Sequence, residues 1–228
     1  MKTLGLVGGL GVGATIHYYS ELAAAHRAIG EDARILISHA ETRQAIRFVE
    51  QKDWSGLARY LAGFLQQLAD GGADIAAIPA ITPHVCLAEL EPLSPLPLVS
   101  ILDAVQDAVR QRGLRRVALF GTRTAMESRI FGRLDGVAEV VPLASAETDL
   151  VHRIYMELVN RGAGSEHQRE QLSRVAAAAI QREHLDAILL AGTDLLLVLN
   201  ESNTPFPYLD CARVHIDAIM NGLGPGVA

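Results

Sequence analysis

The chain alternates short apolar runs with longer segments in which apolar side chains recur every three or four residues. The runs predict buried strands and the periodic segments predict helices with one buried face. The expected strands cover residues 3–8, 33–39, 74–79, 98–101, 116–120, 137–141, 186–191 and 205–209. The expected helices are one ending near Ile29, residues 54–70, a segment from Pro83, residues 103–112, 124–134, 147–160 and 165–183, a short helix near Leu195, and residues 213–221. This alternation predicts a doubly wound α/β fold with parallel sheets.

Two segments outside this alternation are expected to be irregular. The polar stretch around Arg43, directly after the second strand, predicts a loop. The tail Gly222–Ala228 is expected to be loose, as chain ends commonly are.

Two patterns of the first half recur in the second half. The strand and glycine of Lys2–Gly9 resemble Arg115–Thr122, and Ala73–Thr82 resembles Leu185–Asp194. Gly8 and Ala80 are 72 positions apart, and Gly121 and Gly192 are 71 positions apart. The repeat therefore predicts two similar lobes that offer strand ends to a shared cleft. Residues 1–98 with 205–228 are expected to form lobe one, and residues 99–204 lobe two.

Composition narrows the classes of partner. Half of the 228 residues are apolar, which is enough for a substantial core, and the net charge of −6 argues against nucleic acid or an anionic membrane as the main partner. No apolar stretch approaches the length of a membrane span. Cys86 and Cys211 do not make a disulfide framework, so a cytoplasmic location is expected. No cysteine–histidine cluster has metal-ligand spacing, so no metal site is predicted.

The glycine loop Gly8–Gly13 at the end of the first strand has two interpretations. It resembles a dinucleotide-binding loop, but its third glycine is misplaced and the acidic residue expected at the end of the second strand is missing. A nucleotide-binding function is therefore disfavoured. The loop, which includes Gly9, either offers backbone amides to a carboxylate or is a tight strand–helix turn.

Four threonines follow strand ends in the two halves. A hydroxyl and a backbone N–H at a helix start suit a substrate carboxylate, but they also make an ordinary N-cap. The symmetric placement of Thr82 and Thr193 in the two halves favours ligand binding by this pair. Thr122 and Thr124 have the same two interpretations.

Four charged or titratable residues lie near these strand ends. Arg43 either forks onto a carboxylate or is a solvated surface side chain, and Arg161 ends a helix, where a cation is favoured in any case. His84 is either an acid–base group or a buried structural histidine. Asp194 either acts as a base or orienting group, or stabilises a helix N-terminus.

Three segments together resemble the aspartate/glutamate racemase superfamily, and aspartate racemases in particular. They are Met1–Thr15, Thr122–Glu127 and Val151–Leu158, and the resemblance covers nearly the whole chain. It implies two Rossmann-like lobes with the site in the cleft between them, no cofactor, a small carboxylate or amino acid as ligand, and a homodimer.

The resemblance also implies which positions carry the chemistry. In the family, one thiol at each of two strand tips handles the α-proton, and these positions are Ala80 and Gly192 in this chain. The family pattern is otherwise kept at Thr82, His84, Thr193 and Asp194, whereas Ile81 replaces an asparagine. Arg43 falls where aspartate racemases carry a substrate-binding arginine, and Arg161 falls near their second cationic contact.

Two functions are compatible with this pattern. The first is an enzyme with altered chemistry, a cofactor-independent isomerase, racemase variant or lyase, in which Asp194 or His84 carries the proton and Thr82 and Thr193 stabilise an oxyanion. The second is a catalytically silent homologue that binds a small acid and acts as a binding or regulatory protein. Of these two, the sequence favours the enzyme.

Overall fold

The computed structural model describes residues 2–224 and divides into two compact units. The first unit runs to Ile101 and includes the segment from His215 onward, and the second unit is Leu102–Val214. These bounds differ from the predicted ones at residues 99–101, which belong to the first unit, and at residues 205–214, which belong to the second unit because the last strand pairs with a strand of that unit.

Each unit contains a four-stranded parallel sheet, so the predicted α/β class is confirmed. The sheet of the first unit has the order β2-β1-β3-β4. Its strands are β1 Leu4–Gly8, β2 Ile35–His39, β3 Ile75–Ala77 and β4 Leu98–Val99. The sheet of the second unit has the order β6-β5-β7-β8. Its strands are β5 Arg116–Gly121, β6 Glu139–Val140, β7 Ala187–Ala191 and β8 Tyr208–Asp210.

The internal repeat is visible in equivalent hydrogen bonds at the start of each sheet. The Asp74 carboxylate accepts the N–H of Thr3 at 2.7 Å, and the Asp186 carboxylate accepts the N–H of Arg115 at 2.6 Å. Both pairs are 71 residues apart. Each aspartate therefore ties the beginning of its unit's third strand to the beginning of its first.

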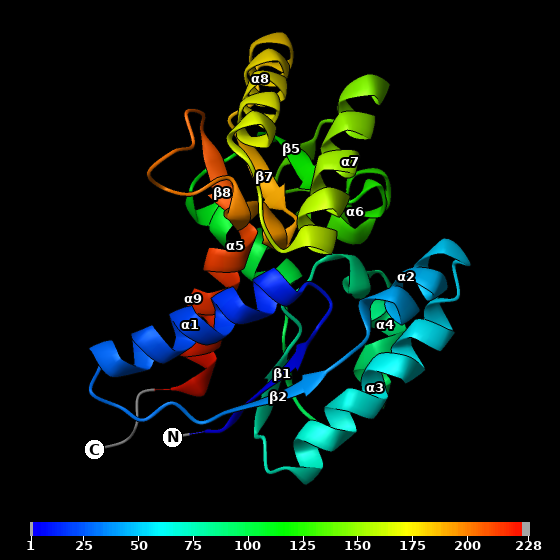
Figure 1. The fold of residues 1–228 in the computed structure, drawn as a ribbon, viewed down its shortest axis with the longest axis vertical. Helices are drawn as coiled ribbons and strands as arrows, with labels where there is room; N and C mark the ends of the chain where they lie inside the picture. Colours follow the sequence, from blue (N-terminus) through cyan, green and yellow to red (C-terminus); the bar gives the residue numbers. More distant parts are fainter. Residues whose placement is uncertain (1, 225–228) are drawn as a thin grey trace. The chain divides into compact units, whose positions relative to one another are not determined.

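Helices cover both faces of the first sheet (Figure 1). The helices of the first unit are α1 Val12–Ala28, α2 Thr42–Glu50, α3 Trp54–Asp70, α4 Leu87–Leu90 and most of α9 Cys211–Leu223, with 3-10 turns η1 Thr82–Cys86 and η2 Glu91–Leu93. Helices α1 and α9 lie on one face, where the Tyr18 hydroxyl meets Nδ1 of His215 at 3.0 Å. Helix α3 packs its leucines on the other face, among them Leu57, Leu61 and Leu65.

One hydrophobic cluster of the second unit lies between its sheet and helices α7 and α8. The helices of this unit are α5 Ile101–Gln111, α6 Arg123–Glu127, α7 Ser145–Arg161 and α8 Glu166–Glu183, with 3-10 turns η3 Ile130–Leu134 and η4 Thr193–Leu197. Phe120 and Ile188 from the sheet pack in one cluster with Ile154 and Leu158 of α7 and Leu172 of α8. This packing fixes α7 over the strands whose ends carry the predicted site residues.

Three expectations for secondary structure need correction. Arg43 lies in the first turn of α2 rather than in a loop, because Glu41 caps a short amphipathic helix there. The helix expected over 124–134 is broken into α6 and η3, with Ser128 extended between them. In the tail, α9 continues to Leu223, and residues 225–228 lie outside the described part of the chain. Within residues 2–224, no helix is long and apolar enough to cross a membrane.

Candidate functional site

The turn after β1 requires glycine at position 9. Gly9 has a φ of +85°, and a side chain there would meet the carbonyl oxygen of Ala40 and, at 2.8 Å, the ring of His39. Its N–H donates to Oγ1 of Thr15 at 3.0 Å. The Gly9 amide is therefore engaged inside the turn, which favours the tight-turn interpretation of this amide.

The segment after β2 is fastened to the same turn. The Thr42 hydroxyl donates to the carbonyl oxygen of Gly9. The N–H of Glu41 donates to the Tyr60 hydroxyl of α3 at 2.8 Å. These bonds hold the beginning of α2, and with it Arg43, at the carboxyl edge of the first sheet.

Arg43 lies beside a second guanidinium group. A hollow of about 420 Å³ is lined by Glu41, Arg43, Gln44 and Arg47. Arg43 and Arg47 are exposed and lie one helical turn apart, so they share a face of α2. Arg47 was missed in the sequence because its spacing from Arg43 has meaning only on a helix.

The end of β3 positions His84 against the main chain. The His84 ring is buried, and its Nδ1 lies 2.8 Å from the carbonyl oxygen of Ala80. Because a carbonyl only accepts, Nδ1 carries the proton of this bond. Thr82 begins η1 between these two residues, and β1 and β3 are neighbouring parallel strands. The first unit therefore brings Thr82 and His84 to the same sheet edge as Gly9.

In the second unit, the threonine after β5 acts as an ordinary helix N-cap. The Thr122 hydroxyl accepts the N–H of Ala125 at 3.0 Å and begins α6, which also contains Thr124. The N–H of Arg123 donates to Nδ1 of His152 at 3.1 Å. Burial, together with the charge of Arg123, lowers the pKa of His152 below its ordinary value. His152 is thus a mainly neutral imidazole at this strand end.

The end of β7 brings together Gly192, Thr193, Asp194 and Tyr155. The Asp194 side chain is buried with 1% exposure, and Tyr155 of α7 donates its hydroxyl to Oδ2 of Asp194 at 3.4 Å. The Tyr155 hydroxyl also interacts with the Thr193 side chain. Burial, and secondarily the Asp194 charge, raises the pKa of Tyr155 far above its ordinary value. Tyr155 therefore stays protonated and acts as a donor.

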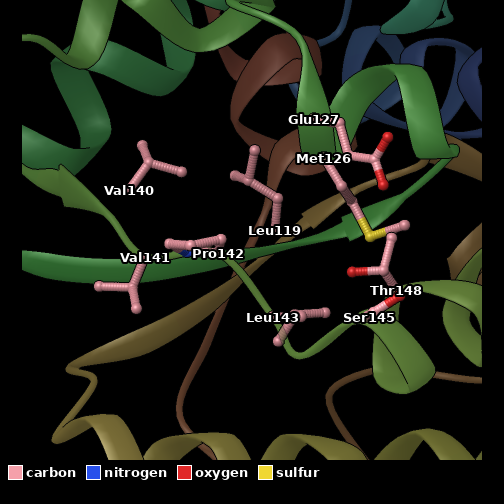
Figure 2. Close-up of a pocket in the computed structure, with 9 residues that line it drawn as sticks. All are labelled: Leu119, Met126, Glu127, Val140, Val141, Pro142, Leu143, Ser145 and Thr148. Atoms are coloured by element: carbon pink, nitrogen blue, oxygen red, sulfur yellow. The ribbon is translucent and has the colours of Figure 1, made fainter.

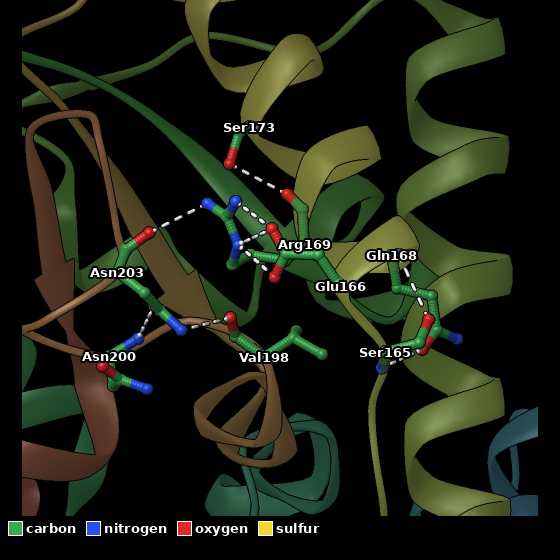
Figure 3. A network of polar contacts seen from close by, with 8 residues as sticks. All are labelled: Ser165, Glu166, Gln168, Arg169, Ser173, Val198, Asn200 and Asn203. Atoms are coloured by element: carbon green, nitrogen blue, oxygen red, sulfur yellow. Dashed lines mark hydrogen bonds and ion pairs between the residues drawn. The ribbon is translucent and has the colours of Figure 1, made fainter.

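The loop that follows η4 is held by a polar network (Figure 3). Arg169 of α8 pairs with Glu166 at 2.8 Å and donates to the carbonyl oxygen of Asn203 at 3.1 Å. The Asn203 side chain in turn donates to the carbonyl oxygen of Val198 and accepts the N–H of Asn200. These contacts fix the carboxyl side of η4, the turn that carries Thr193 and Asp194.

Arg161 ends the helix that packs on η4. It is the last residue of α7, which ends at Gly162 with a φ of +64°. Gly164, directly beyond, has no room for a side chain against Val198 at the end of η4. The exposed Arg161 therefore lies three residues before a contact with the carboxyl end of η4, the turn that begins at Thr193.

The two thiols of the chain are buried and unreactive. Burial raises the pKa of Cys86 to about 12 and raises that of Cys211 well above its ordinary value. Both cysteines are free. Neither thiol is ionised at neutral pH, so neither is a ready nucleophile or base.

A separate cavity of about 380 Å³ lies in the second unit beside the edge strand β6 (Figure 2). Its lining residues are Leu119, Met126, Glu127, Val140, Val141, Pro142, Leu143, Ser145 and Thr148. Its one carboxylate, Glu127, pairs with Arg123 at 2.8 Å. None of the predicted site residues lines this mainly aliphatic cavity.

Tyr155, His152 and Arg47 are the site residues that the sequence did not single out. Tyr155 and His152 lie three residues apart on α7, so they share one face of that helix, and each contacts a different strand end. Among residues 2–224, no group of three or more histidine, cysteine, aspartate or glutamate side chains is arranged to hold a metal ion.

The sequence matches the family model described as Asp/Glu/hydantoin racemase over residues 7–219. This match includes the end of β1, the other strands of both sheets and all the strand ends described above. It includes every predicted site residue.

Solved structures with this fold cover nearly the whole chain. A protein from Yersinia pestis described as a candidate Asp/Glu racemase is 27% identical, with a TM-score of 0.84 over 98% of this chain and 99% of that chain. An aspartate racemase homologue from Pyrococcus horikoshii is 25% identical, with a TM-score of 0.82 over 99% and 100%. A glutamate racemase from Francisella tularensis, solved with D-glutamate, shares the fold at 10% identity, with a TM-score of 0.68 over 100% and 84%.

Proposed function

The chain belongs to the Asp/Glu/hydantoin racemase family, and from that premise we propose that it is an isomerase that exchanges the α-proton of a small amino acid without a cofactor. The observation that carries the proposal is the buried carboxylate of Asp194 at the end of β7, held by the Tyr155 hydroxyl. A buried, hydrogen-bonded carboxylate at a strand end of an α/β sheet is a suitable general base.

Binding of the ligand is proposed for cationic and hydroxyl groups at the sheet edges. Arg43 and Arg47 together offer two guanidinium groups to an anion in the hollow on α2. Arg161, Thr193 and Thr82 are the further proposed contacts, and Gly9, Thr122 and Thr124 remain predicted ones. An amino acid with a second carboxylate fits this charge distribution better than an apolar one.

Proton transfer is proposed for Asp194, with His84 as the second candidate. Neither Ala80 nor Gly192 has a titratable side chain, and Cys86 and Cys211 are held as thiols by their raised pKa values. Because Nδ1 of His84 donates to the carbonyl of Ala80, Nε2 is the nitrogen of this ring that is proposed to exchange a proton. The proton carriers are thus oxygen and nitrogen groups rather than sulfur groups.

A second candidate function is a binding protein without turnover. It is favoured by Ala80 and Gly192, the positions at which the family resemblance implies thiols. In that case the same cations would hold a small acid, and occupancy alone would be the signal.

The test is solvent deuterium exchange at the α-carbon of the L- and D-forms of aspartate and glutamate, and of a wider panel of amino acids. We expect exchange with at least one dicarboxylic amino acid, and an Asp194→Asn variant should lose about 100- to 10,000-fold of that rate. Thermal stabilisation by the same compounds, measured in parallel, separates the two functions. Stabilisation without exchange for any panel member would establish the binding protein and contradict the isomerase.

A further inference from the structure

Position 192 has no room for a side chain, because the ring of Tyr155 already occupies that space. A Cβ atom added to Gly192 would lie 2.7 Å from Cδ2 and 2.9 Å from Cζ of Tyr155, and nearer still to Cε2. Real Cβ atoms essentially never approach other heavy atoms so closely. The φ of Gly192 is −139°, so this glycine is required by the neighbouring ring and not by its backbone conformation.

The ring cannot easily move away from Gly192. Tyr155 is 7% exposed and belongs to the cluster that joins α7 to the sheet, with Ile154 and Leu158 beside it. Its hydroxyl is held at the other end by Asp194 and Thr193. Packing and hydrogen bonding therefore fix both ends of this side chain.

The same contact orients the carboxylate that the proposed function uses. Tyr155 donates to Oδ2 of Asp194, and this hydrogen bond holds the carboxylate in one orientation. Asp194 is the charged group that acts on the Tyr155 phenol. Glycine at 192, tyrosine at 155 and aspartate at 194 thus form one packed arrangement at the end of β7.

We propose that Tyr155 is a positioning residue for proton transfer: its ring replaces a side chain at position 192, and its hydroxyl orients the Asp194 carboxylate toward the α-proton of an amino acid. This inference rests on the proposed isomerase function and names how the end of β7 performs it. In this proposal the Tyr155–Asp194 pair carries out the proton transfer, because position 192 has no side chain that could do so.

The proton-transfer step balances within the protein and its substrate. The α-carbon–hydrogen bond breaks, and the proton forms an O–H bond with a carboxylate oxygen of Asp194. The electron pair stays on the substrate as an enolate-like carboxylate, and Tyr155 keeps its own proton throughout. The O–H proton on Asp194 exchanges with solvent, and transfer of the solvent-derived proton to the same carbon restores the carboxylate of Asp194 and completes one exchange.

A double-mutant cycle tests the proposed coupling. Tyr155→Phe keeps the ring and removes only the hydroxyl, and should lower kcat for α-deuterium exchange on the best panel substrate about 10- to 100-fold with little change in KM, because one hydrogen bond to a charged group is lost. Tyr155→Phe added to Asp194→Asn should cost almost nothing further. Tyr208→Phe, which removes a hydroxyl from β8 of the same unit, is the matched control and should leave both constants unchanged.

A second measurement tests the steric part without any substrate. Gly192→Ala should lower the midpoint of urea unfolding clearly, whereas Gly132→Ala should lower it little, since the nearest atom to that added Cβ is 3.9 Å away. Combining Gly192→Ala with Tyr155→Leu should cost less than the sum of the two single changes, because the smaller side chain vacates the contested space.

The outcomes separate this inference from the proposed function. Wild-type exchange with an equally active Tyr155→Phe variant would overturn the positioning role and leave the isomerase standing. Wild-type protein without exchange on any substrate would overturn the isomerase and the proton-transfer role together. Equal destabilisation by Gly192→Ala and Gly132→Ala would overturn the replacement of a side chain at 192 by the Tyr155 ring.

Discussion

At the scale of single residues, glycine is required at two strand ends for different reasons. Gly9 needs a left-handed backbone and lies against Ala40 and His39, whereas Gly192 has an ordinary φ and lies against Tyr155. The first glycine shapes the turn that carries Thr15 and its bond to the main chain. The second makes room for a tyrosine that contacts the candidate base. A glycine at a strand end therefore has to be explained by its neighbours as well as by its backbone.

Gly9→Ala should destabilise the protein by about 3 kcal/mol or more, because the methyl group adds a steric overlap to the strain of a positive φ. Gly30→Ala is the matched control, since Gly30 has a φ of +75° but nothing within 4 Å of its added Cβ. The control should cost only about 1–2 kcal/mol. Urea unfolding measures the loss in free energy of unfolding for both variants. Equal losses would show that the contact with Ala40 does not contribute to the requirement for glycine at position 9.

At the scale of elements, α9 is fastened to the first unit by one buried histidine. His215 lies 2.8 Å from the carbonyl oxygen of Val99 through Nε2 and accepts the Tyr18 hydroxyl at Nδ1. Because a carbonyl only accepts, the ring is the neutral Nε2–H form. Burial lowers the pKa of His215 to about 3, against an ordinary value of 6.5. The helix is therefore attached through a group that must stay unprotonated.

The first unit should lose stability as the pH falls below 6.5. The folded-state pKa of His215 lies below the unfolded value, so the unfolded chain binds more protons between pH 6.5 and about 3. The free energy of unfolding should fall by up to about 1.4 kcal/mol per pH unit in this window. His215→Gln keeps a donor and an acceptor but does not titrate, and should show a smaller loss between pH 7 and pH 4.5. Equal losses in urea unfolding would assign the acid sensitivity to other groups.

At the scale of the whole molecule, one unit is continuous in the sequence and the other is not. The second unit is the single stretch Leu102–Val214, whereas the first needs its N-terminal part and the segment from His215. Ile216 and Ile219 of α9 are buried, as is His215. The two parts of the first unit are therefore synthesised before and after the second unit. The core of the first unit can be completed only after the second unit has been made.

Fragments should reflect this difference. Residues 102–214 alone should give a helical circular dichroism spectrum and a cooperative melt, because their core cluster is complete. Residues 1–101 alone should melt without cooperativity, since α9 is missing, and a peptide of residues 211–224 should restore the transition. A cooperative melt of residues 1–101 by themselves would contradict the role given to α9.

The sequence by itself determined the fold class, the repeat and the strand ends. Apolar runs and helical spacing are local patterns, so β1, β5 and α3 lie within a residue or two of their predicted bounds. The predicted internal repeat is confirmed, because its two similar patterns fold into two sheets with the same strand order. Thr82, His84, Thr193 and Asp194 follow strand ends as predicted, since a strand's end is read from its own residues.

Only the tertiary structure decided what those strand ends contain. Helix α2 is only nine residues long and mostly polar, and it buries only Ala45 of its own residues, so its sequence was read as a loop. It is a helix in the fold because it packs on α3 through Phe48 and Tyr60, whose rings are 5.8 Å apart. Strand β8 joined the second unit because it pairs with β7. Tyr155 meets Asp194 across 39 residues of sequence. Spacing within one segment carries no information about such a contact, because it depends on how α7 packs against the sheet.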